Sequence, residues 1–421
     1  MKVLWVMNSP IGPASAALGE EYMGSSGGWI QTEYEALSES GISFSFLSTL
    51  PSVGYGELVH RESPIGDIFC VHAPKISYGI RPSRTLMNNV QQVIDRVKPD
   101  LIHIWGTETW LSNAVANCKT EAPRIIFIQG LIGIHQRYLG GYFTKMKENK
   151  LYLRNVSLIC RLKDVLRTVL FTRQANVEAD TIRKCGNVII DSQFAMSYCS
   201  ALGEPIKCYK HVLVPNRVFS QYHWNYDQCE KHTIFTIYGS SAEKGTQQLL
   251  KALAIVKRRI PDVKAIIPGG YSLNSSGQLT ESKRDGFQQV IFNMIYSLGL
   301  ENNVVFTGRL NAAQMAEKLS HAHIFVNTSC MEVHALSLRE AMTEGVPSIS
   351  SLCGSTGEYV TSGSNGFLYR FEEYENLAQY IIHAFERESG IADVSKAASE
   401  SLQKMGNEGR SLEQIYSELV K

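Results

Sequence analysis

The chain has 421 residues, which exceeds the usual size of a single core and predicts two domains of about 200 residues each. Its formal net charge of +1 creates no field that would favour wrapping a polyanion, so a nucleic acid is not expected as the main partner. The nine cysteines are odd in number and never spaced as Cys-x-x-Cys, which is typical of reduced cysteines in a cytoplasmic protein and argues against disulfides and structural zinc. The apolar stretch 1–7 is too short for a signal peptide, and no apolar run of about 18 residues predicts a membrane span.

Short apolar runs alternate with helical-period segments through the first half of the chain. Such alternation predicts βαβ units and a parallel sheet. The expected strands are 3–7, 43–47, 68–72, 101–105, 124–128 and 188–191.

Three features of this first half are candidates for binding an acceptor or a phosphate. Gly27 and Gly28 precede a helix that follows the first strand, and paired glycines let a ligand approach the backbone, although a plain turn is the commoner cause. His103 lies near the end of a buried strand, where a core histidine is the default interpretation. Gln129 ends the strand 124–128, and His135 is the nearest histidine to it.

The stretch 145–173 is rich in basic residues that are interleaved with aliphatic residues at helical spacing. It contains eight Lys or Arg residues against Glu148 and Asp164. An amphipathic basic helix could attach to an anionic membrane surface that carries a lipid-linked acceptor. A helix packed on the first sheet explains the pattern equally well.

The second half also alternates apolar strands with helical segments, but it does not repeat the sequence of the first half. Strands are expected at 233–238, 264–267, 304–307, 323–327 and 348–351, and an aromatic, strand-poor linker precedes them. We therefore predict an N-terminal Rossmann-like domain at 1–220 and a C-terminal domain of the same class at 221–399, followed by a helical stretch at about 400–421.

The most informative feature of the second half is a pair of glutamates, Glu332 and Glu340, between a predicted strand and a helix. If the span were wholly helical, the two carboxylates would lie about 12 Å apart along its axis. That separation suits the two ends of an elongated polar ligand such as a nucleotide sugar. Glutamates at this spacing also occur by chance on solvated helix faces, so the pair alone is a weak signal.

Lys244 adds an anion-binding element upstream. It follows the strand 233–238 and a loop of small residues, and it precedes a helix. Free N–H groups and the helix dipole favour a phosphate at such a position, whereas an isolated Lys-Gly pair is more often a solvated first turn.

Together these motifs resemble, in order and spacing, the donor half of the family 4 retaining glycosyltransferases, over roughly residues 232–370. The residues that carry the resemblance are Val304-Val305-Phe306-Thr307-Gly308-Arg309, Ala322 to Val326, Thr328-Ser329-Cys330-Met331-Glu332, Glu340-Ala341-Met342, Gly345-Val346-Pro347, Gly357-Glu358 and Asn365-Gly366.

The resemblance implies an α/β fold of the GT-B type, with two doubly wound Rossmann-like domains facing across a cleft. It implies that the domain 1–220 binds the acceptor, that the domain 221–399 binds the donor, and that the last helix, about 400–421, packs back on the first domain. It also implies that Lys244 holds the donor diphosphate, that Glu340 binds the ribose and that Glu332 contacts the transferred sugar. The further donor-binding candidates are Gly239, Ser240, Arg309, His334, Ala335, Leu336 and Ser337.

The chain departs from the family pattern at several places. Ser240 stands where the family usually has an arginine, Gln129 stands where it often has a histidine, and Ala335 and Thr328 replace a glycine and a proline. These differences put a histidine-assisted mechanism in doubt and leave Lys244, Arg309 or an arginine elsewhere in the chain to neutralise the diphosphate.

The sequence therefore predicts a retaining, metal-independent glycosyltransferase that moves a sugar from a nucleotide-sugar donor to a hydroxyl acceptor in surface polysaccharide or glycolipid assembly. No cofactor is expected, because no Asp-x-Asp or zinc spacing occurs. The expected location is the cytoplasm, with peripheral attachment to the inner membrane face. Two alternatives stay open, namely a sugar-nucleotide epimerase of similar fold and a catalytically silent nucleotide-sugar-binding protein.

Overall fold

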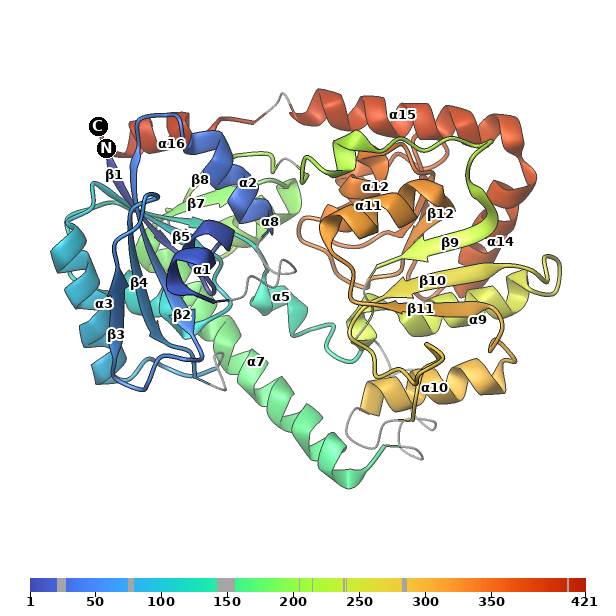
Figure 1. Ribbon diagram of the computed structural model, residues 1–421, viewed down its shortest axis with the longest axis horizontal. Helices are drawn as coiled ribbons and strands as arrows, with labels where there is room; N and C mark the ends of the chain where they lie inside the picture. Colours follow the sequence, from blue (N-terminus) through green and yellow to red (C-terminus); the bar gives the residue numbers. More distant parts are fainter. Residues whose placement is uncertain are drawn as a thin grey trace. The chain divides into compact units, whose positions relative to one another are not determined.

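The computed structural model describes residues 1–20, 28–74, 79–141, 156–203, 205–213, 215–237, 239, 241–281, 286–406 and 409–421. The chain divides into two compact units (Figure 1). The first unit comprises residues 1–137, 167–214 and 408–421, and the second comprises residues 138–166 and 215–407.

The first unit is built on an eight-stranded sheet in the order β3-β4-β2-β1-β5-β6-β7-β8. All neighbouring strands are parallel except β3 and β4, which pair antiparallel at one edge. The central strands are nearly continuous apolar runs, as expected where helices cover both faces. The strands are β1 (Lys2–Val6), β2 (Ser43–Leu50), β3 (Leu58–Arg61), β4 (Asp67–His72), β5 (Leu101–Trp105), β6 (Arg124–Phe127), β7 (Asn187–Ile190) and β8 (Lys207–Lys210).

Helices connect these strands, and two of them, α3 and α8, start at a serine cap. The side chain of Ser83 caps α3 by accepting from the N–H of Leu86, and Ser192 caps α8 in the same way. The helices on this part of the chain are α1 (Gly12–Leu18), α2 (Gly28–Leu37), α3 (Arg84–Val97), α4 (Trp110–Asn117), α5 (Ile132–His135), α7 (Leu158–Cys185) and α8 (Gln193–Ser200).

The second unit has a six-stranded parallel sheet in the order β11-β10-β9-β12-β13-β14. A single cluster of buried apolar residues fills this unit, including Phe235, Leu253 and Phe325. The strands are β9 (Glu230–Thr236), β10 (Lys264–Pro268), β11 (Val304–Gly308), β12 (Ala322–Asn327), β13 (Ser348–Ser351) and β14 (Phe367–Tyr369).

The helices of this unit follow the same rules. A reciprocal capping box between Asn311 and Gln314 starts α11. The elements are η2 (Phe219–Gln221), η3 (Ala242–Lys244), α9 (Thr246–Val256), α10 (Gly286–Ser297), α11 (Ala312–His321), α12 (Leu336–Thr343), α13 (Thr356–Tyr359), α14 (Tyr374–Glu386) and α15 (Glu388–Gly406).

The C-terminal segment returns to the first unit. The predicted helical stretch is two helices, because the chain breaks after α15 and restarts at α16 (Leu412–Leu419), where Ser411 and Gln414 form a capping box. Leu412, Ile415 and Tyr416 of α16 are buried, and Trp5 Nε1 donates to Tyr416 Oη at 3.1 Å.

All eleven predicted strands are present, with bounds that differ by at most three residues. The strands β3 and β8 have no counterpart in the prediction because their sequences mix apolar and charged residues, and β14 has none because its apolar run is only three residues long. The segment 138–166 groups with the second unit, whereas the sequence placed it in the first domain. All nine cysteines are free. Within the described residues, no helix combines the length and the apolarity that crossing a bilayer requires.

Candidate nucleotide-sugar site

The loops after β9 and β12 meet at the topological switch point of the second sheet. Strands β9 and β12 are neighbours, while β10, which follows β9 in the chain, lies on the other side of β9. In open parallel sheets the ligand site lies outside the carboxyl ends of the strands at such a point. The predicted residues Lys244 and Glu332 stand in these two loops.

The loop after β9 is fixed to the loop after β12 by backbone contacts. Gly245 has a φ of +75°, and a β-carbon there would lie 1.8 Å from the carbonyl oxygen of Thr328. The Thr328 hydroxyl in turn donates to the carbonyl of Lys244 at 2.8 Å. Only glycine fits at position 245, which explains why Lys-Gly occurs at the start of α9.

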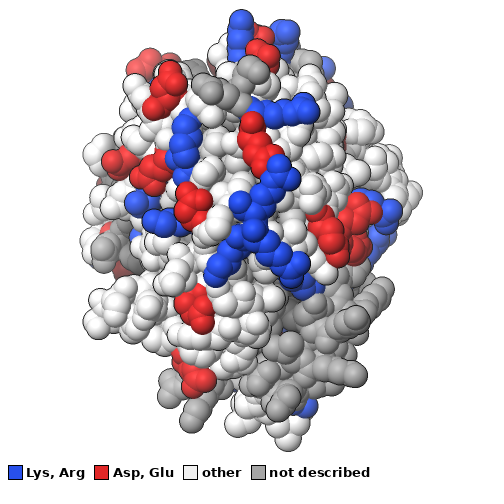
Figure 2. Space-filling view, turned by 90° about the vertical axis from the view of Figure 1, so that its right-hand side faces the viewer, with Lys and Arg blue, Asp and Glu red and all other residues white. Residues whose placement is uncertain are grey.

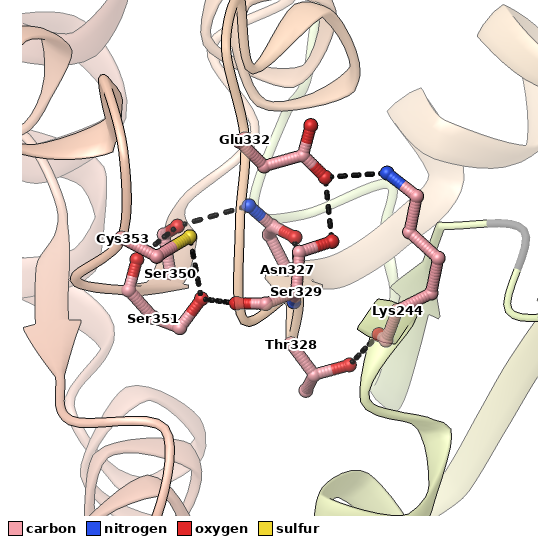
Figure 3. Close-up of polar contacts among 8 residues, drawn as sticks. All are labelled: Lys244, Asn327, Thr328, Ser329, Glu332, Ser350, Ser351 and Cys353. Carbon is pink, nitrogen blue, oxygen red and sulfur yellow. Dashed lines mark hydrogen bonds and ion pairs between the residues drawn. The ribbon is translucent and has the colours of Figure 1, made fainter. Parts of the chain in front are cut away.

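Lys244 and Glu332 form an ion pair (Figure 3). Lys244 Nζ lies 2.7 Å from Glu332 Oε1, and the Ser329 hydroxyl donates to the same oxygen at 2.5 Å. Burial favours neutral Lys244, but the charge and hydrogen bond of Glu332 prevail and raise the Lys244 pKa. Both side chains are only partly exposed, so their charges are weakly screened by water.

The backbone around Glu332 is held from a third loop. The N–H of Ser355 donates to the carbonyl of Glu332 at 3.0 Å. Gly354 has a φ of +51°, and a β-carbon there would lie 1.8 Å from that carbonyl. The N–H of Cys330 donates to the carbonyl of Glu243 at 2.8 Å. The position of Glu332 is therefore set by contacts with two other loops.

Buried hydroxyl and amide groups support this loop from below (Figure 3). Asn327 donates to the Ser350 hydroxyl at 3.1 Å and accepts from the N–H of Ser329 at 3.1 Å. The Ser351 hydroxyl donates to the carbonyl of Ser329. These bonds satisfy the polar groups beneath the ion pair and keep the loop in one conformation.

Glu340 lies on α12, and its environment is far less polar than that of Glu332. Burial raises the pKa of Glu340 to about 8, although the nearby charge of Arg339 opposes the shift. One turn further, burial and then the charge of Glu340 raise the pKa of Glu344 to about 9. Glu344 is 2 % exposed. The first turn after Glu332 is not helical, so the separation of the pair is not that of a continuous helix.

The start of α12 has an unusual conformation. Ala335 adopts the left-handed region with φ +46° and ψ +41°, and no side chain caps the helix. The first N–H groups of α12 at Leu336 and Ser337 therefore have no side-chain cap, as an anion-binding helix start requires. His334 precedes them and is 7 % exposed.

The remaining donor-side candidates are more scattered. Gly239 follows β9, and its carbonyl accepts from the Thr246 hydroxyl at 3.2 Å and from Tyr271 Oη. Arg309 directly follows β11, at the far edge of the sheet, and is exposed. Ser240 lies outside the described residues.

On the first unit, Gln129 lines a small cavity. This cavity, of about 130 Å³, is also lined by residues 8–11 after β1 and by Trp29 and Ile30 of α2. Gly28 is the first residue of α2, and Gly27 lies outside the described residues. Gln129 and the start of α2 are thus brought together at the carboxyl ends of β1 and β6.

His103 lies in the core, away from this cavity's lining. It is fully buried, stacks on Trp105 with ring centroids 4.0 Å apart, and hydrogen-bonds Tyr416 Oη through Nδ1. Burial holds its pKa well below the ordinary value. The geometry gives His103 a structural role in attaching α16, which is the default interpretation of its sequence context.

Glu178 of α7 is a functional candidate that the sequence did not reveal. Its carboxylate accepts from the N–H groups of Ile132 and Gly133, both at 2.9 Å. It also accepts from the hydroxyls of Thr107 at 2.7 Å and Tyr198 at 3.1 Å. This one side chain therefore holds the loop that follows Gln129. Its partners lie 20 to 71 positions away, so no local spacing could indicate it.

One group of three metal-capable side chains occurs in the described part of the chain. His60, Glu62 and Asp67 lie on the β3–β4 hairpin, with potential ligand atoms within 4.8 Å of one another. Arg96 Nη2 lies 3.1 Å from His60 Nδ1, and this cation opposes a metal there.

On the face shown in Figure 2, Lys and Arg lie among Asp and Glu, so this face offers no field of a single sign.

The comparisons with known proteins bear on the second unit first. Residues 221–411 match the family model "Glycosyl transferases group 1". This part of the chain is therefore similar to the group 1 glycosyltransferases. The uncharacterized glycosyltransferase YqgM of Bacillus subtilis is 28 % identical over 140 residues, which are 33 % of this chain and 35 % of YqgM. The match thus spans about a third of the curated relative.

Solved structures match the whole chain at low identity. Sucrose-phosphate synthase from Thermosynechococcus elongatus has a TM-score of 0.71 at 17 % identity, covering 100 % of this chain and 97 % of that one. Anabaena HepE, solved in complex with UDP and glucose, has a TM-score of 0.64 at 17 % identity, covering 100 % and 99 %. These likenesses establish the fold, which is the GT-B architecture of two Rossmann-like parallel-sheet domains, as the sequence predicted.

Proposed function

We propose that the protein is a glycosyltransferase that moves a sugar from a nucleoside diphosphate sugar to a hydroxyl acceptor. The observation that carries the proposal is the Lys244–Glu332 pair at the switch point of the group 1 domain. The predicted motifs of the donor half meet there although they are 88 positions apart. HepE, of similar fold, binds UDP and UDP-glucose, which makes UDP the first nucleotide to test.

Within this proposal, the donor enters between the loops after β9 and β12. Lys244 exchanges its partner Glu332 for the donor diphosphate, while Glu332 accepts hydrogen bonds from hydroxyls of the transferred sugar. Glu340 accepts from the ribose hydroxyls. The uncapped start of α12 adds N–H groups for the phosphates.

Catalysis then depends on stabilising the diphosphate as the glycosidic bond breaks. Lys244 and the N–H groups at helix starts face the charge that develops on the leaving group. The acceptor oxygen bonds to the anomeric carbon on the face from which the phosphate leaves, and the departing phosphate oxygen takes the proton of that hydroxyl. The anomeric configuration is therefore retained without a covalent bond to any side chain. No metal is required, because Lys244 supplies the positive charge that a divalent cation would otherwise provide.

The first unit would hold the acceptor at the cavity beside Gln129. Glutamine can hydrogen-bond a hydroxyl but cannot take its proton, which fits a mechanism in which the leaving phosphate is the base. A glycan or lipid-linked acceptor of surface polysaccharide or glycolipid assembly, used at the cytoplasmic membrane face, is the class we propose.

Calorimetric titration with UDP, GDP and ADP in the presence of EDTA tests the donor site. Wild type is expected to bind one nucleotide selectively, and Lys244→Ala and Glu340→Ala are expected to weaken that binding about tenfold or more. Lys318→Ala, a change on the exposed face of α11, is the matched control. Absence of binding to all three nucleotides would overturn the donor-site assignment.

A further inference from the structure

The first half of α7 exposes a row of large aliphatic side chains. Leu158, Leu162, Val165 and Val169 follow one another at spacings of four, three and four residues, which places them on one face of the helix. Together with Ile159 and Leu166, they are 43 to 69 % exposed. A contiguous apolar row of this kind marks an interaction surface, whereas scattered apolar residues need no explanation.

The same face of α7 continues into a polar groove. Arg173, Asn176 and Asp180 come after Val169 at spacings of four, three and four residues. They line a groove of about 690 Å³ in the first unit, together with Arg81, Asn113 and Asn117 among others. We call it the α7 groove. The helix (green in Figure 1) therefore presents about 16 Å of apolar surface followed directly by a polar site.

The α7 groove carries an excess of positive charge. Its one carboxylate, Asp180, is already paired with Lys184 at 2.7 Å. Arg81 and Arg173 have no carboxylate partner within the residues that the structure describes. The side-chain amides of Asn113 and Asn117 already donate to groups of the protein, so the donors in the groove are mainly those of the two arginines. Two arginines in a concave site favour a phosphate group.

The charged residues next to the apolar row indicate which kind of partner binds it. The charged residues of α7 from Leu158 to Arg173 are Arg161, Lys163, Asp164, Arg167 and Arg173, which are four cations against one anion. A second copy of α7 packed on this face would bring like charges together, which destabilises such a pair. An anionic surface with an apolar interior complements both properties.

We infer that this face of α7 docks on a membrane that carries anionic phospholipids. The aliphatic row enters the boundary between headgroups and acyl chains, and Arg81 and Arg173 hold a lipid phosphate in the α7 groove. The choice of partner rests on the proposed function, in which the acceptor is lipid-linked, but the docking surface is tested without any glycosyl transfer.

Flotation with lipid vesicles tests this inference on the full-length protein. Two kinds are compared: phosphatidylcholine alone, and phosphatidylcholine mixed with phosphatidylglycerol. Wild type is expected to float with the anionic vesicles, and added salt is expected to weaken the binding without abolishing it, because the apolar contribution is not screened. A protein that binds neither kind overturns the inference.

Two pairs of substitutions separate the two halves of the surface. Leu162→Gln and Val165→Gln are each expected to lower the affinity for anionic vesicles about tenfold. Arg81→Ala and Arg173→Ala are each expected to lower it about fivefold for anionic vesicles and to leave any binding to phosphatidylcholine unchanged. The matched controls are Leu352→Gln and Arg370→Ala, which are exposed residues of the second unit.

Three results would contradict the assignment. The α7 variants could bind vesicles like the controls. Inorganic phosphate at low concentration could release the protein from vesicles, which would assign the groove to a free anion. Leu162→Gln could convert a dimer into a monomer in light scattering, which would assign the face to a second copy. A nucleotide-binding experiment on the same variants distinguishes loss of docking from failure of the donor site.

Discussion

Glu344 places a carboxyl group in the core of the second unit. Neither of its oxygens has a hydrogen-bond partner in the described part of the structure, and the side chain is 2 % exposed. Burial raises its pKa to about 9, so the folded protein holds it protonated at neutral pH while the unfolded chain ionises it at its ordinary pKa. The folded state therefore binds more protons than the unfolded state between these two values.

This difference predicts a pH-dependent loss of stability. Where the folded state binds more protons, the free energy of unfolding falls as the pH rises, here from about pH 5 to about pH 9. Glu344→Gln keeps the shape of the neutral acid and removes its titration. Urea denaturation should show the wild type losing a few kcal/mol relative to the variant across this range. Equal slopes for the two proteins would contradict it.

Ala335 makes a second residue-scale prediction possible. It is the one residue at the start of α12 with a positive φ, where a β-carbon is strained by about 1 kcal/mol and glycine is not. We expect Ala335→Gly to be neutral or to stabilise the protein by up to about 1 kcal/mol, although it removes a buried methyl group. Ala335→Val should destabilise it, because a β-branched side chain fits this conformation worst. Thermal unfolding of the two variants checks both signs.

At the scale of the elements, Glu178 connects α7 to the loop after β6. Burial raises the pKa of its carboxyl group, and the four hydrogen bonds it accepts oppose the shift. Glu178→Gln would turn an amide donor toward N–H groups, leaving at least one of them unpaired at a cost of about 1–3 kcal/mol. We predict that the variant raises the KM for the acceptor several-fold and leaves nucleotide affinity unchanged.

Steady-state kinetics with each substrate varied in turn provides the test. Glu39→Gln is the control, because it makes the same chemical change on an exposed part of the first unit. If donor and acceptor constants moved together, or neither moved, Glu178 would have only a general role in stability.

Most strands of both sheets could be predicted from the sequence, and a few elements could not. The predicted strands were recognisable as apolar runs, because buried parallel strands are apolar along their whole length. Strand β8, Lys207–Lys210, lies at the sheet edge and has no such run. The break before α16 was signalled by Ser411 and Gln414 three positions apart, which the prediction of one continuous helix overlooked.

Some of the notable residues could be predicted from the sequence and others could not. Lys244 and Glu332 were found through the resemblance to a family, since nothing in their local context places two residues 88 positions apart in contact. Glu178 and Glu344 were missed because only their burial distinguishes them from other glutamates. From the sequence alone, a glutamate in a helix is expected to be exposed to solvent.

At the scale of the whole molecule, the chain consists of two units with separate cores and a C-terminal segment that belongs to the first. Unfolding need not be two-state in such a chain. A nucleotide that binds the second unit stabilises that unit by mass action and leaves the first at its intrinsic stability. Two thermal transitions are therefore expected in the presence of the nucleotide.

Tyr416 identifies which transition is which. Its hydroxyl accepts from Trp5 Nε1 and hydrogen-bonds His103 Nδ1 in the core of the first unit. Tyr416→Phe would leave both buried groups without this partner, which costs about 1–3 kcal/mol per group. The transition of the first unit should fall by about 5 °C or more, and the nucleotide-sensitive transition should stay in place.

Calorimetric scans of Tyr416→Phe with and without nucleotide check this assignment, with Ser417→Ala as the control on the exposed face of α16. If both transitions fell together, the C-terminal helix would stabilise the two units jointly. A fall confined to the first transition means that α16 completes the core of the first unit, although residues 215–407 of the second unit separate it from β8 in the sequence.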